Sequence, residues 1–198
     1  MTGKRRSRKT FDHQPYLTVE ELRTALAACD ARDRALFAAM VELAMRAGEP
    51  GLLRRTDWRD GRHEVYVRRL KGSKNGTLAC SDELDRALRA WEAERPASAW
   101  LFPGRDRAGP RGLGRDTVRE LWEQAATRAG LSPRARYVHI LKHTRGTLLS
   151  AAGVKREAIG EAMGHAMLTS TDRYLKVTPE DRDRLHRVSA AIAAKVLA

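Results

Sequence analysis

Hydrophobic residues recur along most of the chain every three or four positions, the spacing that places them on one face of a helix. Near the start, the stretch TVEE predicts a capping box, in which Glu21 reaches back to Thr18 at the beginning of a helix that runs to Cys29. A second helix is predicted over 32–47, and Gly48 with the residues EPG is expected to end it. The chain therefore begins with two helices.

The same periodicity predicts further helices downstream. Ser81 is the expected N-cap of a helix that Pro96 closes, and Gly130 is expected to end a helix over 116–129. The remaining helical segments are predicted at 139–151, 155–163, 168–176 and 179–196. In the helix over 139–151 the expected inward positions are Ile140, Leu141, Thr144, Leu148 and Leu149.

One segment departs from the helical spacing. The residues HEVYVRRLKGSKNGTLAC alternate in parts and contain a turn at 74–76, which predicts a β-hairpin. The Gly-, Pro- and Arg-rich stretch WLFPGRDRAGPRGLGRDT predicts a loop after a short extended piece. The expected fold is mostly α with a small antiparallel β-sheet, in one domain over 17–198 after a basic flexible arm at 1–16.

The charge of the chain indicates a nucleic-acid partner. The 198 residues include 38 Lys and Arg against 25 Asp and Glu, a formal charge of +13, and such an excess favours a polyanionic partner such as double-stranded DNA. Arg5, Arg6 and Arg8 in the arm are expected to lie along phosphates, although a solvated tail fits the residues equally well. A solubility device or a ribosome-associated protein would also explain the charge.

Several classes of protein are disfavoured. Cys29 and Cys80 form no metal-binding pattern, the longest apolar run is too short to span a bilayer, and the basic N-terminus lacks the apolar core of a signal peptide. We expect a cytoplasmic protein without a structural disulfide.

The stretch HILKHT places His139 and His143 one helical turn apart, a spacing that suits a metal ion. A hydrolytic zinc helix needs Glu after the first His, but position 140 is Ile. No acidic or Cys side chain nearby completes a set of ligands. We therefore expect no metal here.

The stretch GHAMLTSTDRY carries the other candidate chemistry. Gly164 ends a helix, His165 follows in the turn, and Tyr174 comes nine residues later. A tyrosine is a plausible nucleophile where cations surround its target, and Lys142, His165, Arg173 and Lys176 are candidates to supply them. By itself the segment 155–176 equally suits a helix-turn-helix regulator.

Five motifs in order decide between these readings. They are AMRAGEP with Arg46 three residues before Glu49, LKGSKNGTL with Lys71, HILKHT, AGV at 152–154, and MGH followed by Tyr174. From about residue 17 to 178 the chain resembles the catalytic domain of the tyrosine recombinases, the lambda-integrase-type enzymes of DNA strand exchange. The resemblance implies the mostly helical catalytic fold of that family.

The resemblance also implies a mechanism. Tyr174 would attack the scissile phosphodiester and form a 3′-phosphotyrosyl link, so that integration, excision or inversion of DNA needs no metal, ATP or other cofactor. Arg46, Lys142 and His165 would bind the phosphate oxygens, Lys71 would protonate the leaving oxygen, and His139 would assist proton transfer. His143 would be a structural histidine that supports the helix. Lys74, Arg145 and Arg173 are expected DNA contacts.

Two departures from the family pattern bear on activity. Lys142 stands where the family usually has arginine, and lysine offers a point charge in place of a bidentate fork. Pro50 and Gly51 stand where the family normally continues into a helix. The alternative is therefore a non-catalytic or weakened DNA-binding relative that acts as a recombination or transcription accessory factor.

The resemblance extends to the assembly. It implies a homotetramer on paired DNA sites, associated with the nucleoid, with an accessory DNA-bending protein as a possible partner. The chain resembles the compact fimbrial-switch invertases, which lack the N-terminal core-binding domain of most integrases. The helix over 179–196 is expected to pack either on its own core or on a neighbouring protomer.

Overall fold

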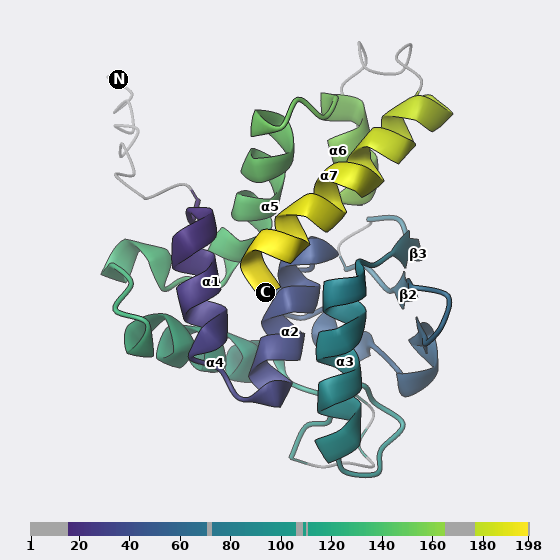
Figure 1. Cartoon of the computed structure of the whole chain (residues 1–198). Helices are drawn as coiled ribbons and strands as arrows, with labels where there is room; N and C mark the ends of the chain where they lie inside the picture. The colour runs from purple at the N-terminus through teal and green to yellow at the C-terminus, as the bar shows by residue number, and fades with distance from the viewer. Residues whose placement is uncertain (1–15, 71–72, 106–108, 110, 165–176, 198) are drawn as a thin grey trace, which may run out of the picture.

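Helices make up most of this protein, and a small sheet lies at one edge of them (Figure 1). The computed structural model describes residues 16–70, 73–105, 109, 111–164 and 177–197. The α-helices are α1 Val19–Ala27, α2 Ala31–Glu42, α3 Asp82–Glu94, α4 Arg115–Arg128, α5 His139–Ala151, α6 Arg156–Ala162 and α7 Pro179–Leu197. Short 3₁₀ turns are η1 Pro50–Leu52, η2 Arg55–Asp57 and η3 Pro133–Ala135, and the strands are β1 Trp58–Arg59, β2 Glu64–Val67 and β3 Gly76–Ala79. The predicted class, mostly α with a small antiparallel sheet, is confirmed.

Side-chain caps set the beginnings of the early helices. Thr18 and Glu21 form the predicted capping box of α1, and Ser81 accepts from the Leu84 N–H at the start of α3. Asp30 caps α2 by accepting from the Asp33 N–H. Each cap satisfies a backbone donor that the helix leaves open, so the helices begin where short polar side chains stand.

The end of α2 differs from the prediction. The helix was expected to continue to residue 47, but it ends at Glu42, and Ala44 has a φ of +50°. The Ala44 N–H donates to the Val41 carbonyl and the Met45 N–H to the Met40 carbonyl, which is the Schellman pattern of a helix end. Ala44, Met45 and Ala47 stay buried beyond the helix, so the hydrophobic pattern did not mark its end.

The predicted hairpin forms the larger part of an antiparallel sheet in the order β1-β2-β3. Val65 pairs with Leu78 and Val67 with Gly76. Strand β1 was not predicted, because two residues are too few to show an alternating pattern.

The core gathers around α2, which is buried along nearly its whole length. Phe37 of α2 meets Trp122 of α4 edge to face, with ring centroids 5.2 Å apart. Helix α7 crosses the molecule and packs against α1, α3, α5 and α6 of its own chain (Figure 1). Its buried positions Leu185, Ala193 and Val196 lie on the face predicted to be apolar. In this single chain the C-terminal helix therefore packs on its own core.

Three loop segments join by backbone hydrogen bonds beside α2. The Gly112 N–H donates to the Gly51 carbonyl at 2.9 Å, and the Leu113 N–H donates to the Phe102 carbonyl at 2.9 Å. Gly51 lies in the short 3₁₀ turn η1, and, as predicted, the chain does not continue there into an α-helix. A Cβ on Gly51 would overlap the Leu113 carbonyl oxygen, so the close approach of the segments requires glycine here.

We expect Gly51→Ala to lower the free energy of unfolding by about 2–3 kcal/mol, because the methyl group forces two backbones apart. Urea unfolding monitored by circular dichroism measures the change. The matched control is Gly76→Ala, where a Cβ meets nothing within 4 Å. A Gly51→Ala protein as stable as the Gly76→Ala protein would contradict this account of the loop contact.

Candidate active site

Arg46 lies in the turn that follows α2, and its side chain is 26% exposed. Its Nη1 donates to Glu49 Oε1 at 3.1 Å, to the Leu70 carbonyl at 3.2 Å and to Ser73 Oγ at 2.9 Å. These bonds join the turn after α2 to the hairpin. The guanidinium is thus held along one edge while part of it faces solvent, as a group that binds an anion requires.

Glu49 is the buried centre of this arrangement, with no exposed surface. Its carboxylate accepts from the backbone N–H groups of Arg46 and Leu70 and from the guanidinium groups of Arg46 and Arg69. Burial alone would raise the pKa of Glu49, but the backbone hydrogen bonds from Arg46 and Leu70 and the charge of Arg69 hold that pKa below its usual value. Glu49 is therefore ionised at neutral pH.

Lys142 enters the same region from α5. Its Nζ donates to the Met163 carbonyl at the end of α6, at 3.0 Å. Burial, followed by the charges of Arg46 and Arg69, lowers the pKa of Lys142 to about 8. The charge of Arg46 thus acts on Lys142, and a phosphate group between the two side chains would be attracted to both.

Comparison with known proteins shows the family of this chain. The phage integrase family matches residues 15–181, which is most of the chain and includes every candidate catalytic residue. This chain belongs to the phage integrase family. It is 32% identical over 178 residues to the tyrosine recombinase XerD of Caulobacter vibrioides, an alignment that covers 81% of this chain and 57% of that relative. It is 33% identical over 156 residues to the putative integrase/recombinase y4gC of Sinorhizobium fredii, covering 76% of this chain and 79% of that protein.

Solved structures of the integrase family share the fold. The crystal structure of XerA recombinase superposes with a TM-score of 0.69 at 21% identity, over 87% of this chain and 64% of that chain. The lambda integrase catalytic core superposes with a TM-score of 0.57 at 18% identity, over 76% of this chain and 91% of that chain. The predicted tyrosine recombinase catalytic fold is therefore confirmed.

The two histidines of HILKHT both lie on α5 and are both exposed. The prediction that His143 supports the helix from within is therefore wrong, because its side chain faces solvent. Among the residues that the structure describes, no three His, Cys, Asp or Glu side chains come together in a group that could hold a metal ion. His139 remains a candidate at the same end of α5 as Lys142.

Other predicted site residues lie outside the described residues: Lys71, His165, Arg173 and Tyr174, and Arg5, Arg6 and Arg8 in the arm. Described residues near Lys71 and His165 in sequence belong to the site, because Leu70 and Ser73 accept from Arg46 and Met163 accepts from Lys142. Lys74 is described and exposed, which leaves its predicted DNA contact as a prediction.

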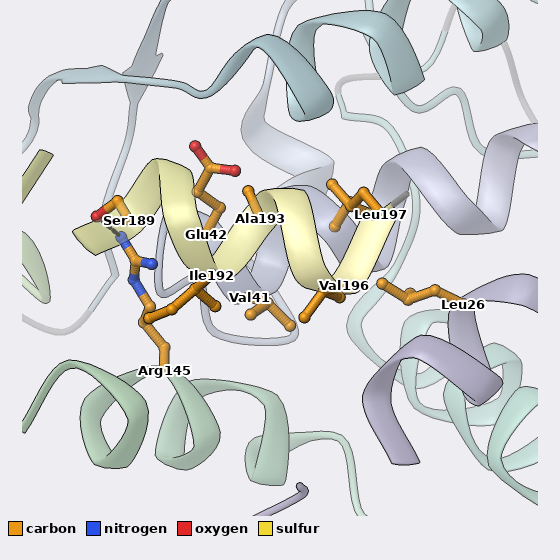
Figure 2. Close-up of a pocket in the computed structure, with 10 residues that line it drawn as sticks. Leu26, Val41, Glu42, Arg145, Ser189, Ile192, Ala193, Val196 and Leu197 are labelled. Atoms are coloured by element: carbon orange, nitrogen blue, oxygen red, sulfur yellow. Dashed lines mark hydrogen bonds between the residues drawn. The ribbon is translucent and has the colours of Figure 1, made fainter. Parts of the chain in front are cut away.

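The prediction that Arg145 contacts DNA is wrong. It is 5% exposed, and Figure 2 shows its side chain rising from α5 to Ser189 on α7, where its Nη2 donates to the Ser189 hydroxyl. Burial lowers the pKa of Arg145 to about 10, while the charge of Glu42 opposes that shift. Glu42 in turn accepts from the N–H and hydroxyl of Ser81. Arg145 therefore joins helices inside the protein and cannot reach DNA.

The helical pattern contained this information about Arg145. The residue is four positions after Leu141 and four before Leu149, so it shares their buried face, opposite to the exposed histidines. The prediction relied on the charge of Arg145 and gave too little weight to its position on the helix.

Sequence reasoning missed Arg69, whose side chain is only 2% exposed and donates to Glu49. Within RRLKG it resembles one more surface cation of the hairpin. The alternation of the strand could have predicted its burial, because it places Arg69 on the same face as the buried residues Val65 and Val67.

We expect Arg145→Met to lower the free energy of unfolding by about 1–3 kcal/mol, because Ser189 and Glu42 lose a buried partner. Thermal or urea unfolding measures the loss. Lys195→Met, an exposed position on α7, is the matched control and should change stability by less than about 0.5 kcal/mol. Equal stabilities of the two variants would show that the Arg145 contact is not a structural link.

Proposed function

We propose that this chain is a site-specific DNA recombinase that integrates, excises or inverts DNA through a 3′-phosphotyrosyl intermediate at Tyr174. The observation that carries the proposal is the linked support of Arg46 and Lys142: Arg46 pairs with Glu49, Lys142 donates to the Met163 carbonyl, and Arg69 bonds both Glu49 and the adjacent Ala162 carbonyl. Membership of the phage integrase family supports it. The chain spans 57% of the XerD relative and 64% of the XerA structure, so the activity is proposed from the shared part.

The residues divide the chemistry as follows. The Tyr174 oxygen attacks phosphorus and gives up its proton with assistance from His139, while the bond from phosphorus to the 5′ oxygen breaks. Lys71 supplies the proton that converts the leaving oxygen into a 5′-hydroxyl. Attack by the 5′-hydroxyl of another strand reverses these steps and rejoins DNA without ATP or metal.

Arg46, Lys142 and His165 stabilise the charge that develops on the nonbridging oxygens. Arg46 suits this role, because its bonds to Glu49, Leu70 and Ser73 hold it in place before DNA arrives. Lys142 supplies a point charge where an arginine fork is usual, so we expect an active enzyme whose rate depends on the charge of that lysine.

Double-stranded DNA is the proposed substrate, and a homotetramer on paired sites the proposed working unit. Two structurally similar chains are XerH bound to a difH substrate and a lambda integrase tetramer bound to a Holliday junction. The net charge of +13 supports phosphate contacts, for which Arg5, Arg6, Arg8, Lys74 and Arg173 are the candidates. We assign residues 1–16 to a basic arm and 17–198 to the catalytic domain, with an accessory DNA-bending protein as a further candidate partner.

The proposed place of action is the nucleoid in the cytoplasm, where a DNA recombinase meets its substrate. Among the residues that the structure describes, no helix is both long and apolar enough to cross a membrane.

A nicked suicide substrate tests the proposed chemistry, because loss of the short cleaved strand traps the covalent intermediate. We expect a protein–DNA adduct on denaturing gels with the wild-type chain and none with Tyr174→Phe, and the yield should be the same in EDTA. Sites trapped from the genome of the host supply the substrate sequence. DNA binding without any adduct would overturn the proposal and favour a non-catalytic accessory factor.

The pH dependence of adduct formation tests the role of Lys142. Because the pKa of Lys142 lies at about 8 in the free protein, its charged fraction falls about tenfold per pH unit above that value. The second-order rate of adduct formation by the wild-type chain should therefore decline between pH 8 and 10 relative to that of Lys142→Arg, which stays charged and at least equally active. Identical alkaline limbs for the two proteins would contradict a phosphate contact by Lys142.

A further inference from the structure

Arg69 follows β2 and turns its side chain into the protein, where it meets three segments. Its Nη1 donates to Glu49 Oε2 at 3.1 Å and to the Ala44 carbonyl at 3.0 Å. Its Nη2 donates to the Leu43 carbonyl at 2.7 Å and to the Ala162 carbonyl at 3.2 Å. One guanidinium thus binds the turn after α2, the last turn of α6 and the buried carboxylate between them.

Both helix ends are negative partners for a cation. Carbonyl groups at a helix C-terminus lack intrahelical partners and carry the negative end of the helix dipole. Arg69 binds such carbonyls of α2 and α6 at the same time. Its effect is to fix the separation of two helix ends that are more than one hundred residues apart in sequence.

Two of the three candidate phosphate-binding residues, Arg46 and Lys142, depend on the same two helix ends. Arg46 lies two residues after Ala44, and its carboxylate partner Glu49 is also the partner of Arg69. Lys142 donates to the carbonyl of Met163, directly after the Ala162 carbonyl that Arg69 binds. Arg69 therefore contacts the supports of both cations and is almost fully shielded from solvent.

The chain leaves room for Arg69 at Gly164. A Cβ on Gly164 would lie 3.1 Å from Arg69 Nε and 3.5 Å from Cγ and Cδ, and Gly164 has a φ of +67°. The Arg69 stem thus lies against the backbone of Gly164. A side chain at position 164 would meet both a strained backbone and the Arg69 stem.

We propose that Arg69 is a positioning residue of the recombinase, which holds the turn of Arg46 and the α6 end beneath Lys142 at the separation that one phosphate group requires. The inference rests on the proposed function for its effect on catalysis. It does not make Arg69 a DNA contact, because its side chain is 2% exposed.

Two variants and a matched control test this role. Arg69→Met keeps the buried stem but loses the fork, and Arg69→Lys keeps the charge and one or two of the four bonds. Arg68→Met is the control, since Arg68 pairs with Asp57, donates to the Leu52 carbonyl and lies over the Tyr66 ring, outside the turn of Arg46 and α6. All three proteins are first compared by urea unfolding, and rates are measured where each is fully folded.

Single-turnover adduct formation is the first measurement. We expect Arg69→Met to cleave the nicked substrate about 100-fold more slowly than the wild type, because a small misplacement of positioning groups has an effect of this size. Its affinity for DNA should change by less than about threefold, since the phosphate contacts are elsewhere. Arg69→Lys should fall in between, and Arg68→Met should match the wild type. Rates of Arg69→Met within threefold of wild type would overturn the inference.

The second measurement needs no DNA, so it separates this inference from the proposed function. The charges of Arg46 and Arg69 lower the pKa of Lys142 and the charge of Glu49 raises it, so removal of the Arg69 charge should move the titration of Lys142 to higher pH. Carbon-13 NMR of the lysine side chains, with Lys142→Arg for assignment, follows this shift, and amide signals of Arg46 and Met163 report the displacement. An unchanged Lys142 titration and unchanged amide signals in a folded Arg69→Met protein would overturn the inference. An absent wild-type adduct with these shifts present would overturn only the proposed function.

Discussion

The buried carboxylate of Glu49 is the constraint on which the candidate site depends. An ionised group without solvent contact is tolerated only where hydrogen bonds and opposite charge replace water, and Glu49 receives two backbone N–H groups and two guanidinium groups. Those four donors come from the turn after α2 and from the end of the hairpin. Satisfying one carboxylate therefore brings together two parts of the chain that each carry a candidate catalytic residue, Arg46 and Lys71.

The three cations near Glu49 differ in how far their side chains are buried. Arg69 is enclosed and binds helix ends, whereas Arg46 and Lys142 are both partly exposed and burial lowers the pKa of Lys142. Arg46 and Arg69 both pair with Glu49, and their charges lower the pKa of Lys142, so positive charge exceeds negative charge among these four side chains. A phosphate group bound here would offset that excess, which is the physical basis of the proposed phosphodiester contact.

A second buried polar group has a structural purpose. Arg145 links α5 to Ser189 of α7 and faces Glu42 of α2, which accepts from Ser81 at the start of α3. The C-terminal helix is thus held by a polar contact as well as by its apolar face. Arg145 and Arg69 show why sequence reasoning about charged residues failed twice: charge was taken as a sign of exposure, whereas the periodicity of the helix and of the strand had placed both residues inside.

The sequence by itself determined most helices of the described residues, the hairpin and the family, because apolar spacing, capping residues and ordered motifs are local properties of the chain. Residues 139–151 form the predicted helix and Ser81 caps the predicted helix α3, while the helix predicted at 168–176 lies outside the described residues. Only the tertiary structure decided where α2 ends, which partners the buried arginines bind and that α7 packs on its own core. These features depend on contacts between segments far apart in the chain: Arg69 with Ala162, Arg145 with Ser189, and Gly51 with Leu113. Local sequence patterns do not specify which distant partner completes a buried charge or a close backbone contact.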